Sequence, residues 1–145
     1  MLLTVDVGNT HIRLGVFPIG GGPLTRTWSM RTSPAVTSDE LALTIRGLLG
    51  DCAHQLSGIS AMSVVPSVTG ELRRMASTYW PELPSVVVAP GVKTGVPLLV
   101  DSPREVGSDR VVNALAAHAL YEGPVVVVDV DTATTVDAVS ARGEL

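Results

Sequence analysis

A short polar turn close to the N-terminus carries residue types that bind phosphate. Two apolar segments flank Asp6, Gly8, Asn9 and Thr10, and we expect both segments to form strands. Gly8 allows the backbone to approach a ligand closely, and turn amides together with Asn and Thr side chains can donate hydrogen bonds to phosphate oxygens. Asp6 can hold Mg²⁺ through water, because Mg²⁺ keeps much of its hydration shell. This turn is therefore a candidate phosphate site.

Arg13 lies shortly after this turn, in the second expected strand. An arginine there can reach a transferring phosphate and stabilise the charge that develops on it. The alternative is an ordinary hairpin turn, because Asn and Gly are common turn formers.

The pattern of this turn is repeated later in the chain. Residues 125–133 follow the order of residues 2–10: an apolar run, an Asp, an apolar residue, a tight-turn position and a small polar residue. Two such loops facing each other would form a nucleotide cleft, which favours phosphate binding over an ordinary turn. The repeat also indicates a fold with two related halves, the second of which begins near residue 123.

A second cluster with chemical potential is the sequence Gly107-Ser108-Asp109-Arg110, near an expected helix start. Inside a helical turn Gly107 would weaken the helix by about 1 kcal/mol relative to Ala, which suggests that a ligand approaches the backbone there. Asp109 can accept a proton from a substrate hydroxyl, and Arg110 can hold a substrate carboxylate through two hydrogen bonds. The alternative is a solvated Asp–Arg pair, which is common and contributes little to stability.

The elements that position these residues follow from the spacing of apolar residues and from turn signals. We expect strands at residues 2–7, 12–17, 25–30, 59–65, 86–89, 125–130 and 132–140. We expect helices at about 39–49, capped by Ser38 or Asp39, at 66–79, and at 103–121. In the last helix, Ser102 would be the N-cap, with Pro103 at the first position and Glu105 at the third.

These elements predict an α/β fold: a mixed sheet with antiparallel leading strands and helices on both faces. We expect one ATPase-like domain at residues 1–122 and the opening strands of an incomplete second domain at 123–145. The run from Val125 to Val128 predicts a strongly buried strand. Without the rest of its sheet, this hairpin would pack on another chain or remain partly exposed.

Composition excludes several functional classes. Of the 145 residues, 46% are hydrophobic and only 3% aromatic, which predicts an aliphatic core. A net charge of −4 argues against nucleic-acid binding. The longest apolar runs fall far short of the ~20 residues that a membrane-spanning helix needs. Cys52 is the single cysteine, so no internal disulfide can form, and we expect a cytoplasmic protein.

Four motifs, in the same order along the chain, together resemble the type III pantothenate kinases. They are residues 6–10 (DVGNT), 91–95 (GVKTG), 103–113 (PREVGSDRVVN) and 129–135 (DVDTATT). The resemblance covers essentially the whole chain and implies an actin/hexokinase/Hsp70-like, ribonuclease H-like fold around a nucleotide cleft. It implies transfer of the γ-phosphate of ATP to pantothenate, the first step of coenzyme A synthesis. It further implies a homodimer that uses Mg²⁺ and a monovalent cation such as K⁺ or NH₄⁺.

The resemblance also implies roles for individual positions. Asp109 would be the general base. The first phosphate loop would contain Asp6, Gly8, Asn9, Thr10 and Arg13, and the second would contain Thr132, Thr134 and Thr135. The pantothenate site would contain Val100, Gly107, Ser108, Asp109 and Arg110. Asp6 would bind Mg²⁺, and Asp129 would be a ligand of the monovalent cation.

Three departures from the family pattern affect these expectations. Asp131 stands where the family usually has Gly, and a carboxylate there would repel ATP phosphates by ~1 kcal/mol at about 4 Å in water and by more in a cleft. Val100 stands where many members have a Tyr. The chain also reaches only the beginning of the second domain, so we expect it to be inactive alone and to need a complementing chain.

Two other interpretations stay open. One is a catalytically silent relative that acts as a binding or regulatory subunit, in which Asp131 is tolerated because no ATP binds. The other is a different phosphoryl-transfer enzyme of the same fold, which the segment Gly107-Ser108-Asp109-Arg110 disfavours.

Overall fold

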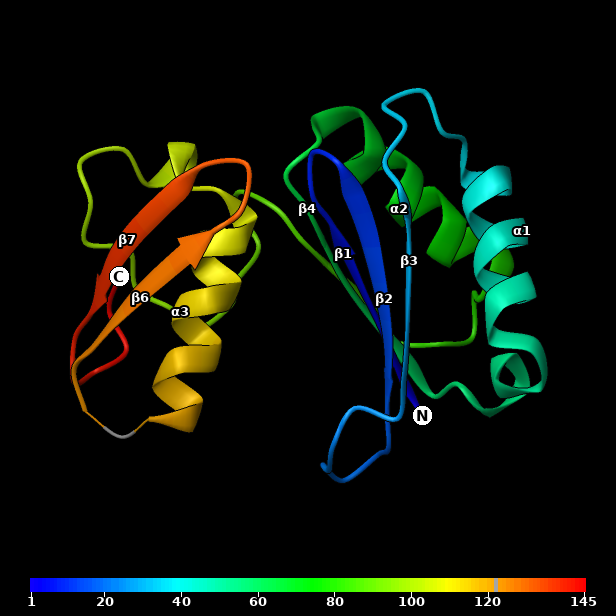
Figure 1. Cartoon of the computed structure of the whole chain (residues 1–145), viewed down its shortest axis with the longest axis horizontal. Helices are drawn as coiled ribbons and strands as arrows, with labels where there is room; N and C mark the ends of the chain where they lie inside the picture. The colour runs from blue at the N-terminus through cyan, green and yellow to red at the C-terminus, as the bar shows by residue number, and fades with distance from the viewer. Residues whose placement is uncertain (122) are drawn as a thin grey trace. The chain divides into compact units, whose positions relative to one another are not determined.

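The computed structural model describes residues 1–121 and 123–145, which form two compact units, Met1–Val87 and Val88–Leu145 (Figure 1). Each unit is described by itself. The domain boundary predicted between residues 122 and 123 involves a residue outside the described ones, and it stays a prediction.

The first unit is built on a mixed sheet. The strands are β1 (Leu2–Val7), β2 (His11–Phe17), β3 (Arg26–Arg31), β4 (Gly58–Ser63) and β5 (Ser85–Val88), in the spatial order β3-β2-β1-β4-β5. β1 pairs antiparallel with β2 and parallel with β4, and β2 pairs antiparallel with β3. The predicted α/β class with antiparallel leading strands is therefore confirmed.

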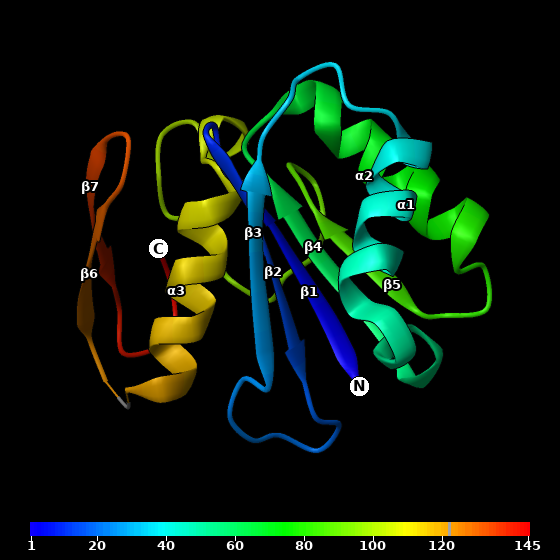
Figure 2. The ribbon, with the colours of Figure 1, turned by 45° about the vertical axis from the view of Figure 1, so that its right-hand side comes forward.

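Helices α1 (Ser38–Leu49) and α2 (Pro66–Tyr79) cover one face of this sheet (Figure 2), and the short 3₁₀ helix η1 (Gly50–Gln55) follows α1. The strands alternate: Leu3, Val5 and Val7 are buried in the core shared with the two helices, whereas Thr4 and Asp6 are half-buried on the opposite face. Alternation of this kind is typical of a sheet with one helix-covered face. Within residues 1–87 both helices lie on this one face, and a helix on the opposite face stays a prediction.

The N-terminus of α1 is capped by Thr37, not by Ser38 or Asp39 as predicted. Thr37 Oγ1 accepts a hydrogen bond from the Glu40 amide at 3.2 Å, and Glu40 Oε2 accepts one from the Thr37 amide at 2.9 Å. These reciprocal bonds form a capping box. The Ser38 amide instead donates to Glu71 Oε2 on α2 at 2.8 Å, so the start of α1 is tied to the neighbouring helix.

Thr37→Ala should lower the free energy of unfolding of the first unit by about 1 kcal/mol, because the helix start loses its side-chain acceptor. Urea titration followed by fluorescence measures this directly, since Trp28 and Trp80 both lie in that unit. Thr44→Ala is the matched control: Thr44 is an exposed position inside α1, where Ala is the better helix former. Equal destabilisation by both variants would contradict the assignment of Thr37 as the cap.

The second unit contains a short 3₁₀ helix η2 (Pro103–Glu105), α3 (Ser108–Leu120), and the antiparallel strands β6 (Val125–Val130) and β7 (Thr134–Val139). The prediction of one helix from Pro103 to Tyr121 was wrong. Ser102 makes no capping bond, and Val106 is extended and buried in the core of the unit. Burial of Val106 interrupts the helical path, so α3 begins only after Gly107.

Gly107 is therefore the N-cap of α3 and has an extended backbone (φ −60°, ψ 146°). It does not lie inside a helical turn, and the predicted helix-weakening cost does not arise. What Gly107 provides is space, because a Cβ atom at this position would clash with Oδ1 of Asp109.

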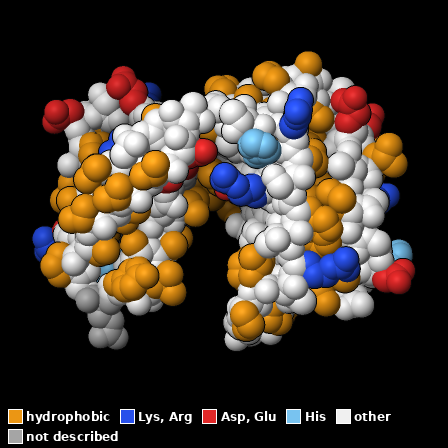
Figure 3. Space-filling view, in the orientation of Figure 1, with side chains coloured by type: hydrophobic (Ala, Val, Ile, Leu, Met, Phe, Trp, Pro, Cys, Tyr) orange, Lys and Arg blue, Asp and Glu red, His pale blue; other side chains and the backbone are white. Residues whose placement is uncertain are grey.

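The β6–β7 hairpin is covered by α3 on one face only. Val125 and Val127 are half-buried in the core with α3, whereas Val126 and Val128 are 64% and 59% exposed. Hydrophobic side chains accordingly gather on the surface of this unit in Figure 3. The prediction of a strongly buried strand was wrong, and the exposed face agrees with the expectation that the hairpin would pack on another chain or remain partly exposed.

No helix among residues 1–121 and 123–145 has the length and apolar character needed to cross a membrane.

Candidate functional site

The first phosphate-type turn is the connection of the β1–β2 hairpin. Asp6 and Arg13 are paired across the two strands, with Asp6 Oδ2 3.6 Å from Arg13 Nη1. The Gly8 amide donates to the His11 carbonyl at 2.9 Å, so it closes the turn and is not directed at a ligand. Asn9 and Thr10 are exposed at the tip of the turn. The structure thus brings all five predicted residues of the first loop into one hairpin.

A residue outside the motif also holds this turn. Thr32, directly after β3, donates through Oγ1 to the Gly8 carbonyl at 2.7 Å and through its amide to the Thr10 carbonyl at 3.0 Å. Sequence reasoning missed Thr32 because its partners lie 24 and 22 residues earlier in the chain, and no periodic signal connects them.

The second phosphate-type turn connects β6 and β7, and its register differs from that of the first. In the first hairpin Asp6 pairs with Arg13, seven positions later, whereas Asp129 pairs with Thr135, six positions later. The Asp131 amide donates to the Ala133 carbonyl at 3.1 Å and closes a tighter turn. The repeat predicted from the sequence is therefore present as a second hairpin. Its strand register is shifted by one residue relative to the first hairpin.

Asp131 needs no left-handed backbone in this turn, because no described residue other than glycine has a positive φ. Asp131 and Thr132 are exposed in the turn, and Thr134 begins β7. Thr135 is half-buried opposite Asp129, on the side of the hairpin that faces α3.

Polar side chains of α3 meet the two aspartates on the inner face of the β6–β7 hairpin. Arg110 forms a two-point contact with Asp137 through Nε and Nη2, with Nε 2.9 Å from Oδ1. Asn113 Nδ2 donates to Asp129 Oδ2 at 2.9 Å. One helix face therefore holds both carboxylates.

Asp137 was not recognised from the sequence, and its charge is almost fully buried, with a side chain that is 3% exposed. The hydrogen bond that Arg110 donates to Asp137 raises the pKa of Arg110 above its usual value, while burial of the guanidinium acts in the opposite direction. The available signal was an acidic residue in the middle of an apolar strand. Arg110, which we expected to hold a substrate carboxylate, uses two of its donor groups on Asp137.

Arg110→Met should destabilise the second unit by about 2 kcal/mol, because it leaves the buried Asp137 without its partner. The double variant Arg110→Met with Asp137→Leu should regain most of this loss, since no unpaired charge remains. Both tryptophans lie in the other unit, so the measurement is amide hydrogen exchange in α3 and β7. A double variant no more stable than Arg110→Met would contradict the assigned role of the pair.

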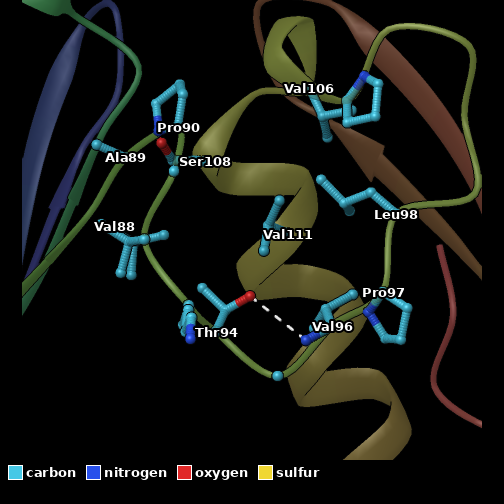
Figure 4. A pocket seen from close by; sticks show the side chains of 15 residues that line it. Val88, Ala89, Pro90, Thr94, Val96, Pro97, Leu98, Val106, Ser108 and Val111 are labelled. Carbon is cyan, nitrogen blue, oxygen red and sulfur yellow. Dashed lines mark hydrogen bonds between the residues drawn. The ribbon is translucent and has the colours of Figure 1, made fainter.

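A cavity of about 380 Å³ lies between the segment 88–98 and α3 (Figure 4). Its walls are mostly aliphatic and include Val88, Leu98 and Val111. Thr94 Oγ1 accepts a hydrogen bond from the Val96 amide at 3.4 Å, and Lys93 supplies a cation to the lining. This volume lies in the range of small-molecule sites.

Ser108 is the predicted substrate residue that lines this cavity. It is only 6% exposed, and its side chain points from the first turn of α3 towards Pro90 in Figure 4. Among residues 1–121 and 123–145, no hydrogen-bond partner of the Ser108 hydroxyl is found, and the residue contributes to the cavity lining. Asp109 is the next residue on the helix, but the cavity lining contains neither Asp109 nor Val100, Gly107 or Arg110.

That Asp6 and Asp129 hold cations stays a prediction. Asp6 offers carboxylate oxygens beside the first turn, with Oδ2 3.6 Å from Arg13 Nη1. Asp129 binds Asn113 through Oδ2, which orients its carboxylate as a possible ligand of a monovalent cation. The described residues contain no group of three or more His, Cys, Asp or Glu side chains placed to hold a metal ion by themselves.

A family model for type III pantothenate kinase matches residues 2–145. The chain belongs to the type III pantothenate kinase family. Type III pantothenate kinases of Rhodococcus erythropolis and Saccharopolyspora erythraea are 60% and 58% identical to it over 99% of its length. The chain spans about half the length of these curated relatives, 54% and 56% respectively. Membership of this family agrees with the α/β fold class predicted from the four motifs.

Solved structures show weaker similarity. An Aquifex aeolicus member of the Ppx/GppA family covers 97% of the chain with 12% identity and a TM-score of 0.48. Thermus thermophilus RuvC covers 61% of the chain with 20% identity and a TM-score of 0.40.

Proposed function

We propose that this chain supplies the first phosphate loop and the acceptor site of an enzyme that transfers the γ-phosphate of ATP to pantothenate. The observation that carries this proposal is the start of α3, where Ser108 lines an aliphatic cavity and is followed directly by Asp109. An apolar cavity with few polar groups suits a branched, hydroxyl-bearing substrate such as pantothenate.

Asp109 is the proposed general base, which would take the proton from the attacking hydroxyl of pantothenate. Gly107 supports this role, because its missing side chain leaves room for the Asp109 carboxylate beside the helix start. Arg110 contributes charge near Asp109 and fixes the hairpin through Asp137. Because Arg110 is engaged in this way, we propose that the pantothenate carboxylate receives at most part of its hydrogen bonding from Arg110.

The proposed nucleotide contacts come from the two hairpin turns. Asn9 and Thr10 at the first tip and Thr132 at the second are exposed and polar, as phosphate ligands must be. Mg²⁺ at Asp6 and K⁺ or NH₄⁺ at Asp129 would neutralise phosphate charge when bound. A homodimer or a complementing chain, and a cytoplasmic location, also belong to this proposal.

One observation favours a second candidate, a silent relative with a binding or regulatory role. Asp131 is exposed in the second turn, which closes through a backbone hydrogen bond from the Asp131 amide, so the turn forms with a carboxylate in it. A negative charge at this place opposes the phosphates of ATP.

The decisive experiment joins this chain to the C-terminal part of the Rhodococcus erythropolis relative and measures phosphorylation of pantothenate with ATP, Mg²⁺ and K⁺. We expect Asp109→Asn to lower kcat by at least 100-fold with little change in the KM for ATP, because only the proton acceptor is lost. Thr78→Ala, at an exposed position of α2 in the other unit, is the control for non-specific effects. Full activity of Asp109→Asn would rule out Asp109 as the base.

In the same hybrid protein, Asp131→Gly should strengthen MgATP binding by about fivefold or more, because it removes a charge that repels phosphate by ~1 kcal/mol even in water. Isothermal titration calorimetry measures the two dissociation constants. Asp101→Gly removes an exposed carboxylate from a loop of the same unit and should leave affinity unchanged. Activity only in the Asp131→Gly form would support the silent relative, whereas equal affinity in both forms would remove the electrostatic argument for it.

A further inference from the structure

The first phosphate turn is anchored from outside by Thr32. This residue directly follows β3, the strand that pairs with the far side of β2. It contacts the turn through two separate groups, the side-chain hydroxyl and the backbone amide, with donor–acceptor distances of 2.7 and 3.0 Å. Both distances are those of well-formed hydrogen bonds.

The two acceptors are the carbonyls of Gly8 and Thr10, which bracket the tip residue Asn9. The Gly8 amide is meanwhile used by the His11 carbonyl at 2.9 Å. Three hydrogen bonds therefore determine the backbone orientation on both sides of Asn9. When the carbonyls are held on the Thr32 side, the Asn9 and Thr10 side chains are left exposed at the tip, with Thr10 Oγ1 3.2 Å from His11 Nδ1.

The backbone of the turn is thus not held by its own sequence alone. Asn and Thr at exposed turn positions have many conformations, and ordering them on ligand binding costs free energy. A turn that is already ordered binds phosphate more tightly, because that cost is met during folding. The hydroxyl bond of Thr32 is the component of this anchoring that a point substitution can remove without altering the backbone.

We propose that Thr32 is a positioning residue of the phosphate site: its hydroxyl holds the Gly8 carbonyl so that the tip of the first turn is ordered before ATP binds. This inference rests on the proposed kinase function. Thr32 itself does not touch the phosphates; it acts through Gly8 and Thr10.

The test compares Thr32→Val, which keeps the shape and the amide but removes the hydroxyl, with Thr32→Ser, which keeps the hydroxyl. Thr27→Val is the matched control, because Thr27 is an exposed residue of β3 that lies opposite Gly15, away from the turn. The first measurement uses the 145-residue chain without ligand. Amide hydrogen exchange at Gly8 and Thr32 should become about fivefold faster in Thr32→Val, and should stay near wild type in Thr32→Ser and Thr27→Val.

The second measurement uses the hybrid with the C-terminal part of the Rhodococcus erythropolis relative. Thr32→Val should raise the KM for ATP by about fivefold and leave the KM for pantothenate unchanged, and Thr32→Ser should restore the wild-type value. A purely structural role would reduce the amount of folded enzyme without this selective change in KM.

Unchanged exchange at Gly8 and Thr32 in Thr32→Val would overturn the inference. Faster exchange together with an unchanged KM for ATP would also overturn it, because the ordered turn would then be irrelevant to phosphate binding. If the wild-type hybrid neither binds MgATP nor phosphorylates pantothenate, the proposed function itself fails and Thr32 has no phosphate site to position. Faster exchange in Thr32→Val would then show only that it orders the turn.

Discussion

The pairing register of the two hairpins is the constraint on which the rest of this structure depends. Side chains alternate between the two faces of a strand, so a shift of one residue moves a whole set of side chains to the opposite face. In the first hairpin Val5 pairs with Leu14, and both face the core. In the second, Val128 pairs with Val136, and both are exposed. The two hairpins are alike in sequence order, yet they present opposite sets of side chains to their helices.

The second unit differs from the first in having two carboxylates on the hairpin face that its helix covers, beside its aliphatic core residues. Asp129 and Asp137 face α3, and a buried carboxylate is stable only with a hydrogen-bonding partner. Arg110 and Asn113, three residues apart on one face of α3, provide those partners. The segment Gly107-Ser108-Asp109-Arg110 therefore serves both the architecture and the candidate site, with Arg110 directed at the hairpin and Ser108 at the cavity.

The candidate phosphate sites differ in how they are supported. The first turn is bound from a third strand by Thr32 and carries a cation, Arg13, opposite Asp6. The second turn is closed within itself, has Thr135 opposite Asp129, and carries an additional negative charge at Asp131. The first turn therefore has more support from neighbouring residues than the second.

Local signals in the sequence were sufficient for most elements and for the family. Helix α2 and strand β6 were predicted with their observed bounds. Pro66 marks the start of α2, and Gly123-Pro124 precedes the start of β6. The resemblance to the type III pantothenate kinases was visible in four motifs that occur in the same order along the sequence. The tertiary structure alone decided the later start of α3, the burial of Asp137, the anchoring by Thr32 and the offset register of the second hairpin. Each of these depends on contacts between residues far apart in the chain or on which face of a strand meets a helix, and propensity and spacing along the sequence do not contain that information.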